Sequence, residues 1–404
     1  MTSHTSLTSS SVGREDVFIV SAVRTPHGRY GGSLRDVRVV ELGGVAGAAA
    51  LDRAGITGDE VGETVVSNCR QAGNGPNPGR QISLRAGVPE SIPAQTVNMA
   101  CASGLKAIQL AAQSIVLGET DVTLAIAAES MSTMPYLAPY SLRWGGVRRG
   151  DVTLADGWKD GGTDPICGMS MGETAEKISR EYGVEREAQD AWSLRSHHRL
   201  GAAWDQGLFD SQVVAVKSED GSLERDETHR PDSTEEKLAS LRPSFEKDGT
   251  VTAGNSSQMA DGAAAVVLAN AAAVERLGLT ARARLVSFAA VGVDPTVMGV
   301  GPTRAIPIAL ERAGFTREDI DLFEINEAFA AQIVQNVREL GLDEEKVNVN
   351  GGGIALGHPT GQSGTRIVVS LLHELERTGG RYGVASLCVG GGQGIAAVIE
   401  RVGA

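Results

Sequence analysis

The sequence repeats one pattern of helix, tight turn and strand in its two halves. Residues 46–68 (AGAAALDRAGITGDEVGETVVSN) and residues 305–326 (AIPIALERAGFTREDIDLFEIN) both read as helix, Ala-Gly turn, acidic residues and strand. A second pair follows in the same order, with TVNMACASGLKAI starting at Thr96 and KVNVNGGGIALGH starting at Lys346. Two repeats in one order favour a duplicated unit over chance similarity. We therefore expect two structurally related halves.

Strands and helices alternate in both halves. The runs Asp16–Val23 and Glu63–Ser67 read as strands, Val39–Ala54 reads as a helix, and the alternation restarts at Ala283–Val291. This pattern predicts an α/β fold with a mostly parallel sheet covered on both faces. From about residue 131 to residue 254, irregular loops interrupt the alternation, and loops of this length usually shape a substrate site.

These sequence patterns predict how the chain is divided into domains. Residues 1–15 are rich in Ser and Thr and are expected to form a disordered leader. The remaining parts are a first half at 16–131 that about 258–281 complete, an inserted loop domain at 132–257, and a second half at 282–404.

Composition excludes several classes of function. The 404 residues carry 37 basic and 50 acidic side chains, a net charge of −13, and only 4% of them are aromatic. Both numbers argue against a nucleic acid or an anionic membrane as partner. The chain shows neither a signal peptide nor a run of about 18 apolar residues. Four widely spaced cysteines, without a CxxC pair, indicate neither a zinc site nor a disulfide framework, so we expect a cytoplasmic protein without bound metal.

One cysteine lies between a predicted strand and the predicted helix that follows it. Cys101 follows the strand-like run Ala94–Val97 and precedes the helical pattern Leu105–Leu117. A helix N-terminus favours the thiolate, which is the nucleophilic form, so Cys101 is expected to ionise more readily than a free thiol. A small buried cysteine that packs as an apolar residue is an equally good interpretation of this stretch alone.

Three stretches of the second half add further reactive groups. Asn326 follows the strand Asp321–Ile325, His358 lies between Gly357 and Pro359, and Cys388 ends a strand directly before a run of glycines. The glycine run leads into a strand rather than a helix, which argues against a dinucleotide site. Two cysteines, a histidine and an asparagine at strand ends are the groups that covalent acyl transfer requires.

The motifs resemble those of the thiolases. VNMACASG, NEAFA, GGGIALGHPTGQSG and CVGGGQG resemble the nucleophile, asparagine, histidine and second-cysteine motifs of that family, and VTAGNSSQMADGAAA resembles its coenzyme A loop. The resemblance runs from about Asp16 onward. It implies two duplicated βαβαβαββ halves in a five-layered α-β-α-β-α core, with a loop domain inserted in the first half.

The resemblance also implies the roles of five residues. Cys101 would carry the acyl group as a thioester, and His358 would take the Cys101 proton. Cys388 would remove the α-proton of acetyl-CoA or protonate the leaving enolate. Asn326 would hold a water that binds the substrate oxygen together with His358. The N–H groups of Cys101 and Gly390 would form the oxyanion hole of the acyl-enzyme.

The implied ligands are acetyl-CoA, acetoacetyl-CoA and coenzyme A, which are substrates, so no separate cofactor is expected. Family members are typically homodimers or homotetramers. The residues that match contacts to the coenzyme are Ser257 near the pantetheine arm, Arg230 near the nucleotide, and Met171, Met298 and Phe329 along the acyl and pantetheine channel.

Residues 129–151, residues 160–176 and the segment PTVMG around Met298 resemble the short-chain, acetyl-CoA acetyltransferase group. Ser170, Gln258 and Gln362 depart from the pattern of that group, so thiolysis of longer 3-ketoacyl-CoA chains is the alternative. A decarboxylating ketoacyl synthase would have a second histidine at Cys388. A non-catalytic acyl-CoA-binding relative would lack one of the reactive residues, and a redox-sensing protein would oxidise Cys101 instead of acylating it.

Overall fold

The structure is a computed structural model that describes residues 16–146 and 149–403. The expected leader, residues 1–15, lies outside the described residues. Five strands form the sheet of the first half in the order β4-β3-β5-β10-β1. Their bounds are β1 Val17–Arg24, β3 Glu63–Ser67, β4 Ala94–Val97, β5 Val122–Ser130 and β10 Ala260–Asn270. The short strand β2 (Gly28–Arg29) pairs with β10 at its margin.

The sheet of the second half repeats this order. Its strands follow one another as β12-β13-β14-β11, and Val347 forms a parallel bridge to Phe323 of β12 where the first half has β4. The bounds are β11 Ala283–Gly292, β12 Leu322–Ile325, β13 Tyr382–Val389 and β14 Gln393–Arg401. Both halves therefore share one topology, which confirms the expected duplication. Only Phe18 and Ile19 of β1 pair with β11, so a short contact joins the two sheets.

Strand direction differs from the expected, mostly parallel sheet. The pairs β3–β4, β3–β5 and β12–β13 are parallel, whereas β5–β10, β10–β1, β13–β14 and β14–β11 are antiparallel. The prediction of a mostly parallel sheet is wrong because a short turn joins the last two strands of the second half, and the long inserted segment, not a single crossover helix, joins β5 to β10 in the first half. The three residues 390–392 connect β13 to β14, and so short a connection imposes antiparallel pairing.

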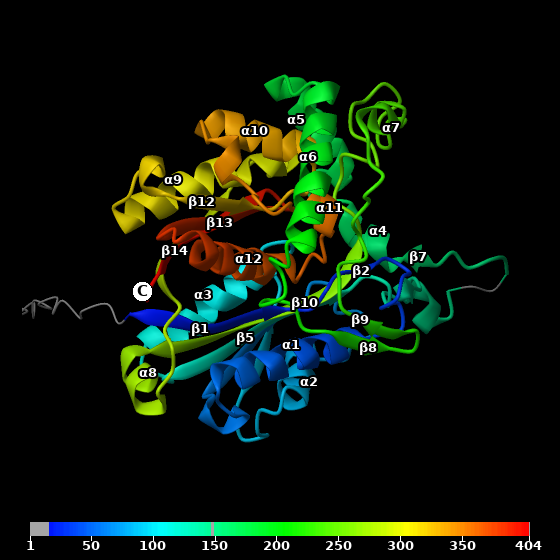
Figure 1. The fold of residues 1–404 in the computed structure, drawn as a ribbon. Helices are drawn as coiled ribbons and strands as arrows, with labels where there is room; N and C mark the ends of the chain where they lie inside the picture. Colours follow the sequence, from blue (N-terminus) through cyan, green and yellow to red (C-terminus); the bar gives the residue numbers. More distant parts are fainter. Residues whose placement is uncertain (1–15, 147–148, 404) are drawn as a thin grey trace, which may run out of the picture.

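Helices cover both sheets and also separate them. Figure 1 shows the layers from top to bottom as α9 and α10, the second sheet, α12 and α3, the first sheet, and α1 and α2. Three apolar core clusters fill the spaces between these layers, and the middle one joins α3 and α12 to both sheets. The bounds are α1 Val39–Ala54, α2 Pro78–Arg85, α3 Ser103–Val116, α9 Gly301–Ala313, α10 Ala330–Leu340 and α12 Ser363–Thr378. This arrangement is the five-layered core that the resemblance implied.

The two central helices approach each other closely at their first turns. A methyl group at Gly104 of α3 would lie 2.6 Å from the backbone nitrogen of Thr365. A methyl group at Gly364 of α12 would lie 2.3 Å from the backbone nitrogen of Leu105. Only glycine permits this backbone contact. It brings Cys101, just before α3, close to the loop that carries His358.

The segment between β5 and β10 lies beside the layers and contains the longest helix, α6 (Figure 1). Its elements are β6 Tyr136–Leu137, β7 Ala155–Asp156, α4 Gly157–Gly162, α5 Met171–Tyr182, α6 Arg186–Asp205, β8 Val216–Ser218, β9 Gly221–Leu223 and α7 Glu235–Ala239. Two short helices lie elsewhere, α8 at Ala271–Leu277 and α11 at Gly353–Leu356.

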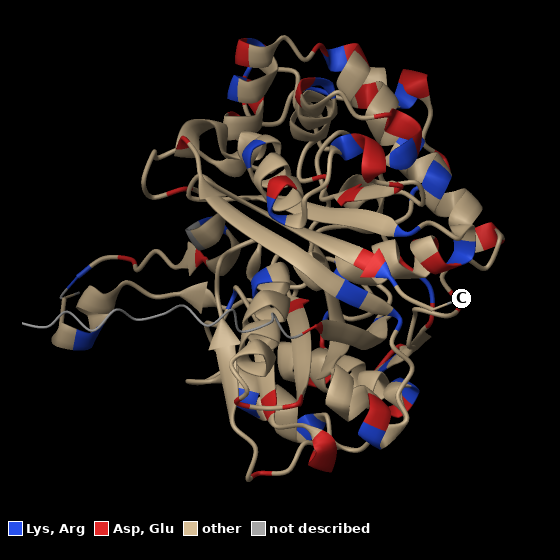
Figure 2. Cartoon of the chain, turned by 90° about the vertical axis from the view of Figure 1, so that its left-hand side faces the viewer, with Lys and Arg blue, Asp and Glu red and all other residues tan. Residues whose placement is uncertain are grey.

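Charged side chains gather on the outer helices and loops, whereas the central strands carry few of them (Figure 2). Within residues 16–146 and 149–403, none of the helices combines the length and the apolar character that crossing a membrane requires.

Candidate active site

Cys101 lies in a tight turn between β4 and α3. Ala100, directly before it, has a φ of 46°, a left-handed conformation that is uncommon for a residue other than glycine. The hydroxyl of Ser103 stabilises the turn, because it donates to the Ala100 carbonyl at 2.6 Å and accepts from the Met99 N–H at 2.8 Å. The turn presents Cys101 to a cavity beside the start of α3.

The Cys101 thiol is in an environment that holds its proton. Burial raises its pKa above the ordinary value of 9.0, and a hydrogen bond from the Gly390 N–H lowers the pKa only in part. The expectation that the helix N-terminus makes this thiol ionise readily is therefore wrong for the unliganded protein, because desolvation outweighs the backbone donors. Cys101 consequently requires a base, and it lies in one cavity with His358.

His358 supplies a neutral imidazole. Burial, followed by the positive charge of Arg366, lowers the pKa of His358 from 6.5 to about 3. The ring Nδ1 lies 2.6 Å from the Ser363 hydroxyl oxygen. The backbone N–H of His358 donates to the Gln258 carbonyl at 2.8 Å. A neutral imidazole can accept a proton at neutral pH, which a protonated one cannot.

Cys388 is the last residue but one of β13 and is buried. Burial raises its pKa well above 9.0, and the nearby Cys101 raises it further. After Cys388 the chain turns through Gly390, and the next residue, Gly391, donates its N–H to the Asp164 carboxylate at 2.9 Å. The second thiol is therefore protonated at rest and lies near the first.

Asn326 follows β12 and faces the histidine. Its side-chain nitrogen lies 3.5 Å from each ring nitrogen of His358. Its side-chain oxygen is buried and has no hydrogen-bond partner within the described part of the chain. This oxygen is available to accept a hydrogen bond from a substrate or a water molecule.

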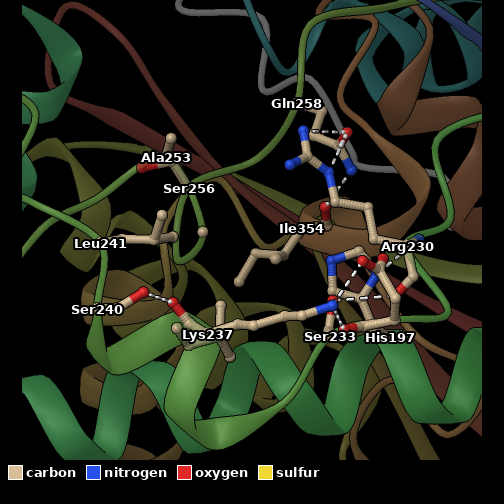
Figure 3. A pocket seen from close by; sticks show the side chains of 13 residues that line it. His197, Arg230, Ser233, Lys237, Ser240, Leu241, Ala253, Ser256, Gln258 and Ile354 are labelled. Carbon is tan, nitrogen blue, oxygen red and sulfur yellow. Dashed lines mark hydrogen bonds and ion pairs between the residues drawn. The ribbon is translucent and has the colours of Figure 1, made fainter.

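Eight of the ten residues predicted from the sequence line one cavity of about 440 Å³. These are Cys101, His358, Cys388, Gly390, Ser257, Met171, Met298 and Phe329. Asn326 is not among the lining residues but contacts His358. Arg230 lines a second cavity of about 300 Å³, which shares Ser256 and Gln258 with the first (Figure 3).

Sequence reasoning missed several residues that connect these segments. Ser363 contacts the His358 ring, and Arg70 lines the larger cavity. The buried Glu129 carboxylate accepts hydrogen bonds from the N–H groups of Cys69, Arg70 and Gly361 at 2.8–3.2 Å. It thereby joins a loop of the first half to the histidine loop. A glutamate inside the apolar run DVTLAIAAE was the signal available in the sequence.

Two family models cover almost the whole chain. The thiolase N-terminal domain matches residues 17–272, and the thiolase C-terminal domain matches residues 279–401. The chain belongs to the thiolase family. Within residues 16–146 and 149–403 there is no cluster of three His, Cys, Asp or Glu side chains arranged to hold a metal ion.

Two relatives from Cupriavidus necator illustrate this similarity. An acetyl-CoA acetyltransferase is 47% identical to the chain over 392 residues, which are 96% of this chain and 99% of that protein. The beta-ketothiolase BktB is 49% identical over 397 residues, again 96% of this chain and 99% of that protein.

Solved structures agree with the fold. Human mitochondrial 3-ketoacyl-CoA thiolase in complex with CoA superposes with a TM-score of 0.94 at 42% identity, and the match covers 96% of this chain and 98% of that one. The Bacillus anthracis acetyl-CoA acetyltransferase superposes with a TM-score of 0.93 at 44% identity, and the match covers 96% and 99% of the two chains.

Proposed function

We propose that this protein is an acetyl-CoA C-acetyltransferase, which condenses two molecules of acetyl-CoA to acetoacetyl-CoA and coenzyme A in a reversible reaction. The observation that carries the proposal is that the thiols of Cys101 and Cys388 and the neutral imidazole of His358 line a single cavity. Relatives named acetyl-CoA acetyltransferase, at 43–47% identity over nearly their whole length, support the choice of the two-carbon substrate.

In the first step, the Cys101 sulfur attacks the carbonyl carbon of acetyl-CoA while His358 accepts the thiol proton. The bond from that carbon to the coenzyme A sulfur then breaks, and the proton passes from His358 to the departing thiolate. The N–H groups of Cys101 and Gly390 stabilise the negative oxygen of the intermediate. Losing one such donor typically costs about 100- to 1000-fold in rate.

In the second step, His358 accepts the thiol proton of Cys388, and the resulting thiolate removes a proton from the methyl carbon of another acetyl-CoA. The resulting enolate attacks the acetyl carbon on Cys101, the Cys101 thioester bond breaks, and the Cys101 thiolate takes the proton from His358. Asn326, through a bound water, and His358 stabilise the enolate oxygen. In the reverse direction the Cys388 thiol donates its proton to the departing enolate, and its raised pKa keeps that proton on the sulfur until the enolate forms.

The coenzyme is held along the line from the larger cavity to the smaller one. Ser257 contacts the pantetheine arm, and Met171, Met298 and Phe329 line its channel. Arg230 attracts the phosphates of the nucleotide end, and thereby supplies local positive charge in a protein of net charge −13.

Mass spectrometry of the reduced protein after mixing with acetyl-CoA tests the first step. We expect one added acetyl group on the peptide that contains Cys101, and none on that peptide in the Cys101→Ala variant. An intact, reduced protein that takes up no acetyl group would falsify the proposal. It would leave the non-catalytic binding protein or the redox sensor as the better interpretation.

Thiolysis of longer 3-ketoacyl-CoA chains is the second candidate, because a solved 3-ketoacyl-CoA thiolase is among the proteins of closely similar fold. A series of 3-ketoacyl-CoA substrates of increasing chain length separates the two. We expect kcat/KM to be highest for acetoacetyl-CoA. A maximum at a clearly longer chain would favour the second candidate.

A further inference from the structure

The side chain of Gln258 joins the two cavities. Its Oε1 accepts hydrogen bonds from both Nε and Nη2 of Arg230 at 3.2 Å, as Figure 3 shows. Its Nε2 donates to the carbonyl oxygens of Thr228 at 2.9 Å and Ile354 at 3.1 Å. One amide group therefore uses both its ends to hold Arg230 against the loop that leads to His358.

The side-chain partner of Arg230 is an uncharged amide, which does not offset the positive charge of the guanidinium. Within the described residues, no carboxylate lies within ion-pair distance of Arg230. The other cation of the smaller cavity, Lys237, is paired with Asp232 at 2.7 Å. The pKa of His197 is lowered to about 4, mainly by burial, so His197 is neutral at pH 7. Within the described residues, Arg230 is thus the cation of this cavity that no carboxylate pairs directly, although Asp232 acts on it at longer range.

The backbone of Gln258 has a separate contact. Its carbonyl oxygen accepts the N–H of His358 at 2.8 Å. The Gln258 side chain therefore orients Arg230 in the smaller cavity, while the Gln258 backbone holds His358 in the larger one. Substituting Gln258 changes the contact with Arg230 and leaves the backbone contact with His358.

We propose that Gln258 is a positioning residue that orients Arg230 toward the phosphate-bearing nucleotide end of coenzyme A thioesters. The inference rests on the proposed function and adds to it the residue that makes full coenzyme A thioesters better substrates than shortened ones. An amide suits this task because it fixes the direction of the guanidinium without neutralising it, as a carboxylate would.

The test compares two thioesters of the same acyl group. Acetoacetyl-CoA carries the nucleotide end, whereas acetoacetyl-N-acetylcysteamine ends before it. For Gln258→Met we expect the KM for acetoacetyl-CoA to rise about tenfold, the change that corresponds to the loss of about 1.4 kcal/mol of binding. The kcat with this substrate, and kcat/KM for the shortened thioester, should stay within about twofold.

Gln258→Glu separates orientation from charge. The carboxylate can still accept hydrogen bonds from Arg230, but it neutralises the guanidinium. We expect the KM for acetoacetyl-CoA to rise and to depend less on salt concentration than in the parent enzyme. In an Arg230→Met background, Gln258→Met should change KM no further, because both substitutions remove the same contact.

Gln113→Met is the matched control, since Gln113 is exposed on α3 and lines neither cavity. An unchanged KM in Gln258→Met, or an equal loss of kcat/KM with both thioesters, would overturn the inference, and the second result would indicate a merely structural role. A parent enzyme that cleaves neither thioester would instead refute the proposed function.

Discussion

The imidazole Nδ1 of His358 lies 2.6 Å from the hydroxyl oxygen of Ser363, in the first turn of α12. The Ser363 hydroxyl in turn donates to the Pro359 carbonyl at 3.1 Å. With its single proton used in that bond, the hydroxyl accepts from Nδ1–H. This arrangement leaves Nε2 without a hydrogen, so its lone pair can accept the proton of Cys101 in the proposed first step. Ser363 thus favours the tautomer that the proposed first step requires.

Replacing Ser363 by alanine should slow acylation. Without the hydroxyl, His358 loses the partner that holds its tautomer and its orientation. We expect the rate of Cys101 acetylation to fall about 100-fold, the lower end of what a positioned base contributes. The rate is measured by stopping the acetylation reaction at successive times and determining the acetylated fraction by mass spectrometry. Ser370→Ala is the control on the same helix, because the Ser370 hydroxyl has no partner within the described part of the chain. Equal rates in both variants would refute the role of Ser363.

Replacing Cys388 by serine should separate the two chemical steps. The hydroxyl is a far weaker acid than the thiol, so proton transfer to and from the methyl carbon of acetyl-CoA should slow by about 100-fold or more. Acetylation of Cys101 does not use this group and should persist. The two readouts are the acetyl adduct on Cys101 and the formation of acetoacetyl-CoA. Cys167 lines neither cavity, so Cys167→Ser should change neither the acetyl adduct on Cys101 nor the formation of acetoacetyl-CoA. Parallel loss of both steps in Cys388→Ser would contradict this division of roles.

The elements of the fold were largely predictable because local patterns determine them. The helix expected at Val39–Ala54 has those bounds in the structure, and the repeat between residues 46–68 and 305–326 corresponds to α1–β3 and α9–β12. The second repeat, between the stretches that start at Thr96 and Lys346, predicts equivalent structure only as far as Asn98 and Asn348. After Asn98, α3 begins within five residues, whereas the loop with His358 intervenes before α12. Strand direction was not predictable from alternation alone.

The candidate site was predictable where motifs carry it, and not where distant segments meet. Cys101, His358 and Cys388 stood out because small residues and strand ends surround each of them. The contact between Gln258 and Arg230 spans 28 residues, and the bonds of Glu129 to Gly361 span 232. No local pattern indicates such contacts. The direction of the Cys101 pKa shift depends on how deeply packing buries the sulfur, which helix position alone does not reveal.

Buried histidines should make the protein labile in acid. Burial lowers the pKa of His27 to about 4 and that of His358 to about 3. Below pH 6.5 the unfolded chain therefore binds protons that the folded chain does not, and the free energy of unfolding falls as pH falls toward 4. Each histidine contributes a slope of about 1.4 kcal/mol per pH unit. Urea denaturation across this range measures the slope, and His27→Gln should reduce it. A midpoint that does not change with pH would contradict the prediction.

The glycine contact between α3 and α12 should be essential for stability and for the alignment of the site. In Gly364→Ala, the new methyl group would lie 2.3 Å from the backbone nitrogen of Leu105, and no flexible side chain can yield there. We expect the free energy of unfolding to fall by about 1–3 kcal/mol, the usual cost of overpacking. The acetylation rate should fall as well, because the helix that follows Cys101 must shift away from the helix that carries Ser363.

Gly292→Ala provides the comparison for this last substitution. Gly292 ends β11, and a methyl group there would meet no atom within 4 Å. Gly292→Ala should change the free energy of unfolding by no more than about 0.5 kcal/mol, as other substitutions outside packed contacts do. Urea denaturation of both variants gives the two free energies. If Gly364→Ala is as stable as Gly292→Ala, the central helices can separate at little cost. The close approach of the helices would then not be what aligns Cys101 with His358.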